Sequence, residues 1–222
     1  MSFEGLITCM PRAFSEALGA ESAFFFCDHP KETRSLIQGV SGTSPYLKSL
    51  IDQERTWLNS ALFDPDNVMA DITQNLCNET NIAVALRRAK RRMALWVALC
   101  DLGGLWTLDQ VMQSLTNFAD IAVAHALRSA FHHQVERGKP KGFGLNEDPD
   151  NASIFILAMG KMGAGELNYS SDIDLICLFD DSHFDPADFH EARNFFIKTT
   201  REMSSMLNDI TSDGYVFRTD LR

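Results

Sequence analysis

The chain has 222 residues, 45% of them hydrophobic, and a formal net charge of −10. This length and apolar content suffice for a buried core and predict one or two globular domains, which excludes a disordered chain. The acidic balance argues against binding to a nucleic-acid backbone, which requires a basic surface, so an anionic nucleotide would need a metal ion.

No run of ~18 apolar residues is present, and the start MSFEGLITCMPRAF lacks the basic region of a signal peptide. We therefore expect no membrane association and a cytoplasmic location. The cysteines form no CxxC pair and have no histidines at metal-ligand spacing. They are predicted to be reduced and mostly buried, and they stand at positions 9, 27, 77, 100 and 177.

Serine or aspartate followed by proline marks two helix starts in the first part of the chain. Ser44-Pro45 offers an N-cap and a proline at the first helical position, and the apolar pattern after it continues to Leu58. Asp64-Pro65 has the same pattern and predicts a second helix start. An apolar stripe at helical spacing then covers 81–102 and ends at Gly103-Gly104.

A capping box is predicted at Thr107 and Gln110, before a helix over 108–137. Residues 1–137 therefore form a predicted helical region. The segment 138–151, GKPKGFGLNEDPDN, is rich in glycine, proline and turn formers, so it predicts a linker or an active-site loop.

After this loop the apolar period changes. Continuous apolar runs predict buried strands over 153–159 and 173–179, and Asp185-Pro186 begins a helix. A third strand is expected over 215–221, after Gly214. The predicted class is α+β, with a helical region followed by a core over 152–222 in the order strand, turn, strand, helix, strand.

The segment GKMGAGELNYSSDID, between the first two strands, carries the candidate chemistry. Side chains alternate along a strand, so Asp172 and Asp174 are expected on one face, where both can bind the same divalent ions. Two-metal phosphoryl transfer needs shared carboxylates of this kind. Asp220 on the next strand is the candidate third ligand.

The glycine turn before these aspartates can approach a phosphate group closely. Gly160 and Gly163 free the backbone N–H groups for an anion, and Ser170 and Ser171 can donate hydrogen bonds to it. Lys161 adds a positive charge. Taken alone, such glycines, serines and aspartates are more often turn and loop residues, and GKMGAG matches neither the P-loop nor GxGxxG.

The string GKMGAGELNYSSDIDLICLFD, with FRTDLR downstream, resembles the signature of the glutamine synthetase adenylyltransferase family, GK(L/M)GxxELNxxSDxDLI. The likeness extends more loosely over SPYL at 44–47 and LRRAKRRMALWVALCDLGG at 86–104. It implies a nucleotidyltransferase-type mixed sheet with flanking helices. Family members carry two such halves, an N-terminal one that removes AMP from glutamine synthetase and a C-terminal one that attaches it.

The signature begins about 160 residues after Met1, as in the family's N-terminal half, so the resemblance implies deadenylylation by phosphorolysis. It implies metal ligands at Asp172, Asp174 and Asp220, two Mg²⁺ ions, and ATP, ADP and phosphate as small-molecule partners. Glutamine synthetase and a PII signalling protein would be the protein partners. The family pattern DxRLRP is cut at Asp220-Leu221-Arg222, which predicts a truncated chain with an incomplete sheet.

Several alternatives stay open. Another enzyme of the same fold could transfer nucleotides to an antibiotic, an RNA end or a different protein, although the string ELNYSSDID disfavours this. A regulatory module could bind glutamine synthetase or a PII protein without catalysis. The basic cluster at 87–92 is interpreted mainly as a solvated helix face, or else as a phosphate or partner contact, and His132-His133 as surface residues.

Overall fold

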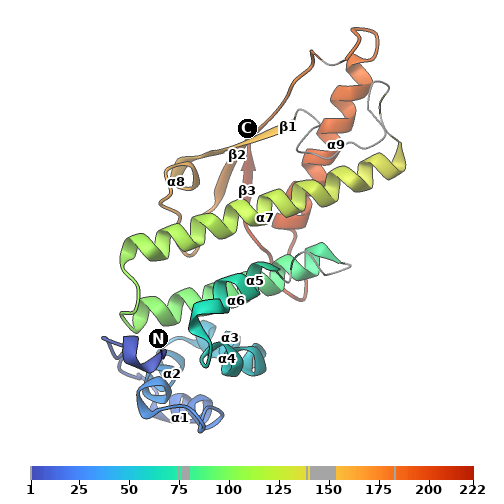
Figure 1. The fold of residues 1–222 in the computed structure, drawn as a ribbon. Helices are drawn as coiled ribbons and strands as arrows, with labels where there is room; N and C mark the ends of the chain where they lie inside the picture. Colours follow the sequence, from blue (N-terminus) through green and yellow to red (C-terminus); the bar gives the residue numbers. More distant parts are fainter. Residues whose placement is uncertain (1, 75, 77–80, 139, 141–153, 183) are drawn as a thin grey trace. The chain divides into compact units, whose positions relative to one another are not determined.

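The computed structural model describes residues 2–74, 76, 81–138, 140, 154–182 and 184–222 (Figure 1). The class is mixed α+β, with helices first and a small three-stranded sheet after them. The elements are η1 (Glu4–Leu6), α1 (Glu16–Phe24), α2 (Lys31–Thr43), α3 (Pro45–Gln53), α4 (Arg55–Ala61), η2 (Pro65–Asn67), α5 (Val68–Gln74), α6 (Ile82–Leu102), α7 (Leu108–Arg137), β1 (Ile154–Met159), α8 (Gly160–Gly163), β2 (Ile173–Phe179), α9 (Phe189–Asn208) and β3 (Thr219–Leu221).

The chain forms two compact units. The first contains Met1–Asn78 and Arg88–Leu115, and the second contains Glu79–Arg87 and Thr116–Arg222. The predicted linker at 138–151 lies outside the described residues except for Gly138 and Pro140, so the division into a helical region and a catalytic core stays a prediction.

Helix starts follow the capping residues. The Ser44 hydroxyl accepts a hydrogen bond from the Leu47 N–H at 3.2 Å, with Pro45 as the first helical residue of α3. The capping box of α7 is reciprocal: the Thr107 N–H donates to Gln110 Oε1 at 2.8 Å, and the Gln110 N–H donates to Thr107 Oγ1 at 3.3 Å. The helix starts predicted at Ser44 and at Thr107 are confirmed, as is the length of α7.

Other predicted boundaries were wrong. The helix expected from Ser44 to Leu58 breaks at Glu54, whose backbone lies outside the helical region and whose side chain pairs with two arginines. The helix expected from Asp185-Pro186 begins only at Phe189. The third strand is short because the N–H groups of Val216 and Phe217 both donate to the Leu207 carbonyl, at 2.9 and 3.0 Å, and so cap α9 instead of joining the sheet.

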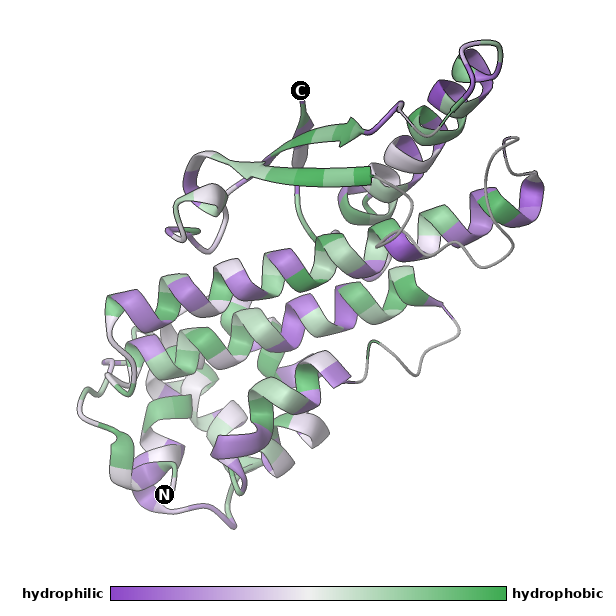
Figure 2. Cartoon of the chain, turned by 45° about the horizontal axis from the view of Figure 1, so that its top comes forward, coloured by the Kyte–Doolittle hydropathy of each residue, from purple (hydrophilic) through white to green (hydrophobic). Residues whose placement is uncertain are grey.

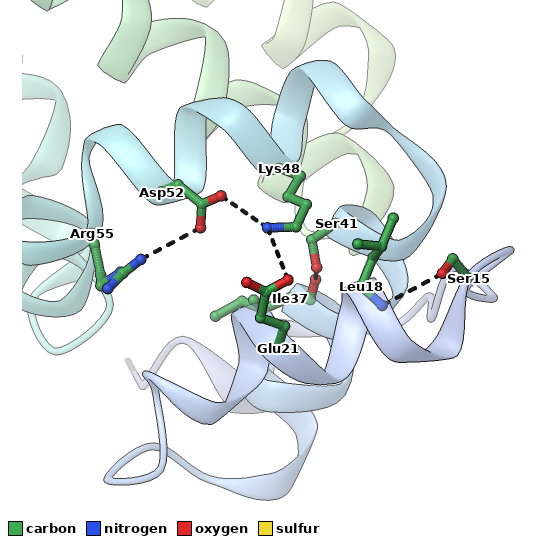
Figure 3. Close-up of polar contacts among 8 residues, drawn as sticks. All are labelled: Ser15, Leu18, Glu21, Ile37, Ser41, Lys48, Asp52 and Arg55. Carbon is green, nitrogen blue, oxygen red and sulfur yellow. Dashed lines mark hydrogen bonds and ion pairs between the residues drawn. The ribbon is translucent and has the colours of Figure 1, made fainter.

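Exposed ion pairs join the first helices of the first unit (Figure 3). Lys48 Nζ on α3 lies 2.9 Å from Asp52 Oδ2 and 3.5 Å from Glu21 Oε2 on α1, and Arg55 lies 3.6 Å from Asp52. These contacts are on the surface, so each contributes at most about 1 kcal/mol. The core beneath them supplies the stability; its largest buried side chains include Trp96, Phe3, Phe26, Leu36, Ile37, Ile51, Leu58, Ile72 and Met93.

Glu54 is a buried carboxylate of this unit, with 5% of its surface exposed. Its two oxygens accept from Arg91 Nε at 3.1 Å and from Arg92 Nε at 2.8 Å. The Arg92 guanidinium also lies 5.1 Å from the centre of the Trp57 ring. The ion pairs therefore fasten α6 to the α3–α4 junction.

The same basic cluster supplies a buried anchor to the second unit. Arg87 is 3% exposed and donates to three backbone carbonyls: Ala83 at 2.8 Å, Asp209 at 2.6 Å and Gly214 at 2.8 Å. These bonds hold the turn that leads from α9 into β3. The interpretation of 87–92 as a solvated face was thus wrong: backbone carbonyls bind the buried Arg87, the Glu54 carboxylate binds Arg91 and Arg92, and the other basic side chains are half-buried.

The sheet has the order β1-β2-β3. β1 runs antiparallel to β2, with Met159 opposite Asp174, and β3 runs parallel to β2, with Asp220 opposite Asp174. A parallel pair needs a long crossover, and α9 provides it. The predicted order of strand, turn, strand, helix and strand is confirmed.

The inner face of the sheet is packed and the outer face is open. Ile154 on the inner side packs against Phe131 of α7 and against Phe195 and Phe196 of α9. Both β1 and β2 are hydrophobic along their length (Figure 2), yet Phe155, Leu157 and Leu178 are 47–49% exposed. The prediction of buried strands is therefore confirmed for the inner face and wrong for the outer one, because among the described residues the helices cover only one side.

The cysteines are free thiols at the four described positions. Cys100 is buried and Cys177 half-buried, but Cys9 and Cys27 are exposed, so the prediction of mostly buried thiols was wrong for these two; Cys77 lies outside the described residues. His132 and His133 are exposed, as predicted, and His133 pairs with Glu202 at 2.5 Å. None of the helices in the described part of the chain combines the length and the apolar character that a membrane span requires.

Replacing Glu54 by glutamine is expected to lower the free energy of unfolding by about 3 kcal/mol, because Arg91 and Arg92 would remain desolvated without a counter-ion. Urea unfolding followed by circular dichroism measures the loss. The matched control is Glu21→Gln at an exposed pair, with an expected loss below about 1 kcal/mol. Equal losses in the two variants would contradict the importance of burial at Glu54.

Lys90 provides a test by pH. Burial lowers the pKa of Lys90 to about 8, whereas an unfolded lysine titrates near 10.5. Between these values the unfolded chain binds more protons than the folded one, so the free energy of unfolding rises with pH, by up to about 3 kcal/mol. Urea midpoints at pH 7.5 and 9.5 should show this rise in the wild type and a smaller one in Lys90→Met. Parallel pH profiles would contradict the assignment.

Candidate functional site

Three aspartates gather near the end of the sheet where β2 begins. Asp172 directly precedes β2, Asp174 is the second residue of β2, and Asp220 is the middle residue of β3. The parallel register makes Asp174 and Asp220 direct neighbours, so their side chains share one face. Asp174 also lies opposite Met159, which places both carboxylates on the outer, open face.

Two arginines bind these carboxylates. Arg218 Nε donates to Asp172 Oδ1, and its Nη2 donates to the Ser170 carbonyl at 3.0 Å. Arg222 Nη2 lies 3.1 Å from Asp174 Oδ1 and 3.6 Å from Asp220 Oδ2. The sequence analysis assigned no role to either arginine. Their spacing of two residues from Asp220 could have indicated them, because side chains two positions apart in extended backbone lie on the same face.

The donor set suits a hard cation, since Mg²⁺ prefers carboxylate oxygens. One guanidinium nitrogen already stands between Asp174 and Asp220, so these two side chains can share a positive charge. In the described part of the chain, however, no group of three acidic, histidine or cysteine side chains is arranged to hold one ion. Asp172 is turned to Arg218, and the metal-binding role of all three residues stays a prediction.

The glycine turn after β1 has two separate geometrical requirements. Gly160 adopts φ +57°, and a Cβ there would lie 2.9 Å from Asp174 Oδ2. Gly163 closes the single turn α8, and its Cβ would lie 2.4 Å from the Ala158 carbonyl oxygen. Gly160 thus lets the backbone touch the carboxylate, whereas Gly163 lets α8 pack on β1.

The remaining predicted phosphate-binding residues lie around this turn. Lys161 is exposed on α8. Ser170 is exposed and gives its carbonyl to Arg218, and the Ser171 hydroxyl accepts from the Asn168 N–H at 3.2 Å. Leu167 holds the segment between Lys161 and Ser170 in place. It is fully buried, and its N–H donates to Thr116 Oγ1 at 3.2 Å.

A cavity of about 190 Å³ lies on the opposite face of the sheet from the aspartates. Asp120 of α7 is its acidic residue, and burial raises the pKa of that carboxyl. The cavity belongs to the packing between α7 and the sheet and not to the carboxylate site. Its lining consists of Asp120, Val123, Ala124, Leu127, Ile156, Ala158, Met162 and Leu175.

Comparison with known proteins identifies the family. The model of the glutamate-ammonia ligase adenylyltransferase family matches residues 34–222. The chain belongs to this family. The match contains the glycine turn, all three aspartates and both arginines of the site.

Curated relatives carry the name bifunctional glutamine synthetase adenylyltransferase/adenylyl-removing enzyme. The chain is 41% identical over 197 residues to that of Bradyrhizobium sp. strain ORS 278, and 36% identical over 196 residues to that of Xanthobacter autotrophicus strain Py2. Each match covers 85% of this chain and 20% of the relative. The relative from Rhodopseudomonas palustris strain HaA2 is 37% identical over 203 residues, which are 88% of this chain and 20% of that one. The chain thus spans about a fifth of the length of the curated relatives it matches.

The contact between Gly160 and Asp174 can be tested by Gly160→Ala. Both this variant and its control, Gly214→Ala, place a side chain at positive φ and should lose about 1 kcal/mol of stability, but only at Gly160 would the new Cβ meet a carboxylate. We expect Gly160→Ala to weaken Mn²⁺ binding, measured by electron paramagnetic resonance of the free ion, and Gly214→Ala to leave it unchanged. Equal Mn²⁺ affinities in the two variants would contradict this role of Gly160.

Proposed function

We propose that this chain is the catalytic part of a nucleotidyltransferase-type domain that removes AMP from a tyrosine of glutamine synthetase. The reaction is phosphorolysis, in which phosphate and adenylyl-tyrosine give ADP and tyrosine. The observation that carries the proposal is the direct pairing of Asp174 with Asp220 beside the Gly160 turn, within a sequence that belongs to the adenylyltransferase family.

The carboxylates of Asp172, Asp174 and Asp220 would hold the metal, with two Mg²⁺ ions as the expected complement. When bound, such ions neutralise negative charge on the transferring phosphoryl group and on the departing oxygen. Asp174 and Asp220 suit this task because they are adjacent in the sheet and exposed on its open face.

The chain's other residues would bind and orient the reactants. Gly160 brings the backbone close to Asp174, Lys161 supplies an exposed positive charge, and the hydroxyls of Ser170 and Ser171 can donate to phosphate oxygens. Gly163 supports the turn through its packing on Ala158. The open apolar face beside the aspartates offers a surface for an aromatic ring of the substrate.

The chemistry is a single in-line displacement at the AMP phosphorus. An oxygen of hydrogenphosphate forms the new P–O bond, the bond from phosphorus to the tyrosyl oxygen breaks, and that oxygen takes up the proton that the phosphate gives up. Catalysis then depends on positioning and electrostatic stabilisation, without a covalent intermediate on the protein.

A second function is favoured by the names of the relatives, which carry both activities. In this alternative, the same site would transfer AMP from ATP to a tyrosine of glutamine synthetase, with pyrophosphate as the leaving group. The preference for removal comes from the sequence prediction alone. A PII signalling protein as regulator and a cytoplasmic location belong to the same proposal.

The test is an assay of both directions with the 222-residue chain. Adenylylated glutamine synthetase, phosphate and Mg²⁺ are expected to yield ADP, and Asp174→Asn should lower the rate at least about a hundredfold because a ligand of the transferring centre is lost. Labelled ATP with unmodified glutamine synthetase measures attachment.

AMP attachment without ADP release would contradict deadenylylation and assign this site to adenylylation of glutamine synthetase. No turnover in either direction, together with stable binding to glutamine synthetase that Asp174→Asn leaves intact, would indicate a non-catalytic binding module. Circular dichroism of Asp174→Asn checks that the variant is folded.

A further inference from the structure

Two exposed arginines sit in the middle of the carboxylate site. Arg218 and Arg222 flank Asp220 at a spacing of two residues, and their side chains are 58% and 65% exposed. Arg218 binds Asp172, and Arg222 binds Asp174 and Asp220 together. Every one of the three aspartates therefore has a guanidinium partner.

These pairs engage one oxygen of each carboxylate, so the guanidinium groups compete with a divalent cation for the aspartates. Arg222 Nη2 lies between the two adjacent carboxylates, at 3.1 Å from Asp174 and 3.6 Å from Asp220. Exposed ion pairs of this kind contribute little stability, so a divalent ion can displace the guanidinium groups at small cost. Three carboxylates and two arginines give these five side chains a net charge of about −1, so a cation on the aspartates makes the cluster more attractive to a phosphate group.

We infer that Arg218 and Arg222 are substrate-binding residues that exchange partners, from the aspartates to the oxygens of a phosphoryl group, when a divalent cation binds the aspartates. This inference rests on the proposed function. The planar guanidinium fork matches phosphate oxygens in a bidentate manner, and both arginines are attached next to the expected metal ligands. The ligand class is a phosphate mono- or diester, or inorganic phosphate.

The exchange also explains the alternating order of arginine, aspartate and arginine along 218–222. Arg218 and Arg222 directly precede and follow β3, and side chains two positions apart in extended backbone share a face, so this segment places a candidate metal ligand between two guanidinium groups. Arg87 supports this placement, because it fixes the backbone at Asp209 and Gly214 just before the segment begins.

The test compares Arg218→Gln and Arg222→Gln with the wild-type chain in two binding measurements. The first is Mn²⁺ affinity by electron paramagnetic resonance, and the second is the affinity for inorganic phosphate and for AMP by calorimetry at saturating Mn²⁺ and constant ionic strength. Arg201→Gln, at an exposed arginine of α9, is the matched control, and circular dichroism checks the fold of each variant.

We expect Arg222→Gln to bind Mn²⁺ at least as tightly as the wild type, because a competitor for Asp174 and Asp220 is removed. Both site variants should bind a phosphoryl ligand about tenfold more weakly, the loss expected for one charge-assisted hydrogen bond. A loss for AMP alone would assign the arginines to the nucleotide, and a loss for inorganic phosphate alone would assign them to the attacking phosphate. Arg201→Gln should behave as the wild type.

Unchanged affinity for both phosphoryl ligands in both variants, with Mn²⁺ still bound, would overturn the inference and leave the arginines as partners of the aspartates only. Weaker Mn²⁺ binding in Arg222→Gln would also overturn it, because the arginine would then support the metal site instead of competing for it. Absence of Mn²⁺ binding by the wild-type chain, with Asp174→Asn indistinguishable from it, would refute the metal site of the proposed function itself.

Discussion

The parallel pairing of β2 with β3 is the constraint on which the candidate site depends. It places Asp220 directly beside Asp174, although the whole of α9 lies between them in the chain. The pairing is held by hydrogen bonds from the Ile173 N–H to the Arg218 carbonyl and from the Arg222 N–H to the Leu175 carbonyl, at 2.9 and 3.0 Å. It follows that the site exists only when the crossover helix has returned the chain to the sheet.

Buried charged side chains fix the backbone of the segments that precede the β2–β3 pairing in the chain. Arg87 satisfies three backbone carbonyls, two of them in the turn after α9, while Arg91 and Arg92 neutralise Glu54 in the first unit. A buried guanidinium is favourable only when its donors have acceptors, so these contacts specify where the turns must lie. One basic stretch of α6 thereby serves the interior of both units.

The glycine turn links the fold to the chemistry of the family signature. The two glycines leave room for different neighbours. Gly160 allows the Asp174 carboxylate to lie close to the backbone, and Gly163 allows the Ala158 carbonyl of β1 to do so. The glycines of the signature therefore serve the packing of the turn against β1 and against the Asp174 carboxylate. At the acidic end of the signature, the carboxylates of Asp172 and Asp174 are paired with the guanidinium groups of Arg218 and Arg222, which lie on either side of Asp220.

Local sequence determined the helix caps, the helix over 108–137, the α+β class, the order of elements and the family, because capping residues, apolar periods and a long motif act over short distances. It also pointed to Asp172, Asp174 and Asp220 as one site. Only the tertiary structure decided the register that pairs Asp174 with Asp220, the arginine partners of the aspartates, and the open outer face of the sheet. The break at Glu54 and the burial of Arg87 belong to the same group, because a charged residue in a helical pattern has the same sequence signal whether solvent or a distant backbone carbonyl accepts its hydrogen bonds.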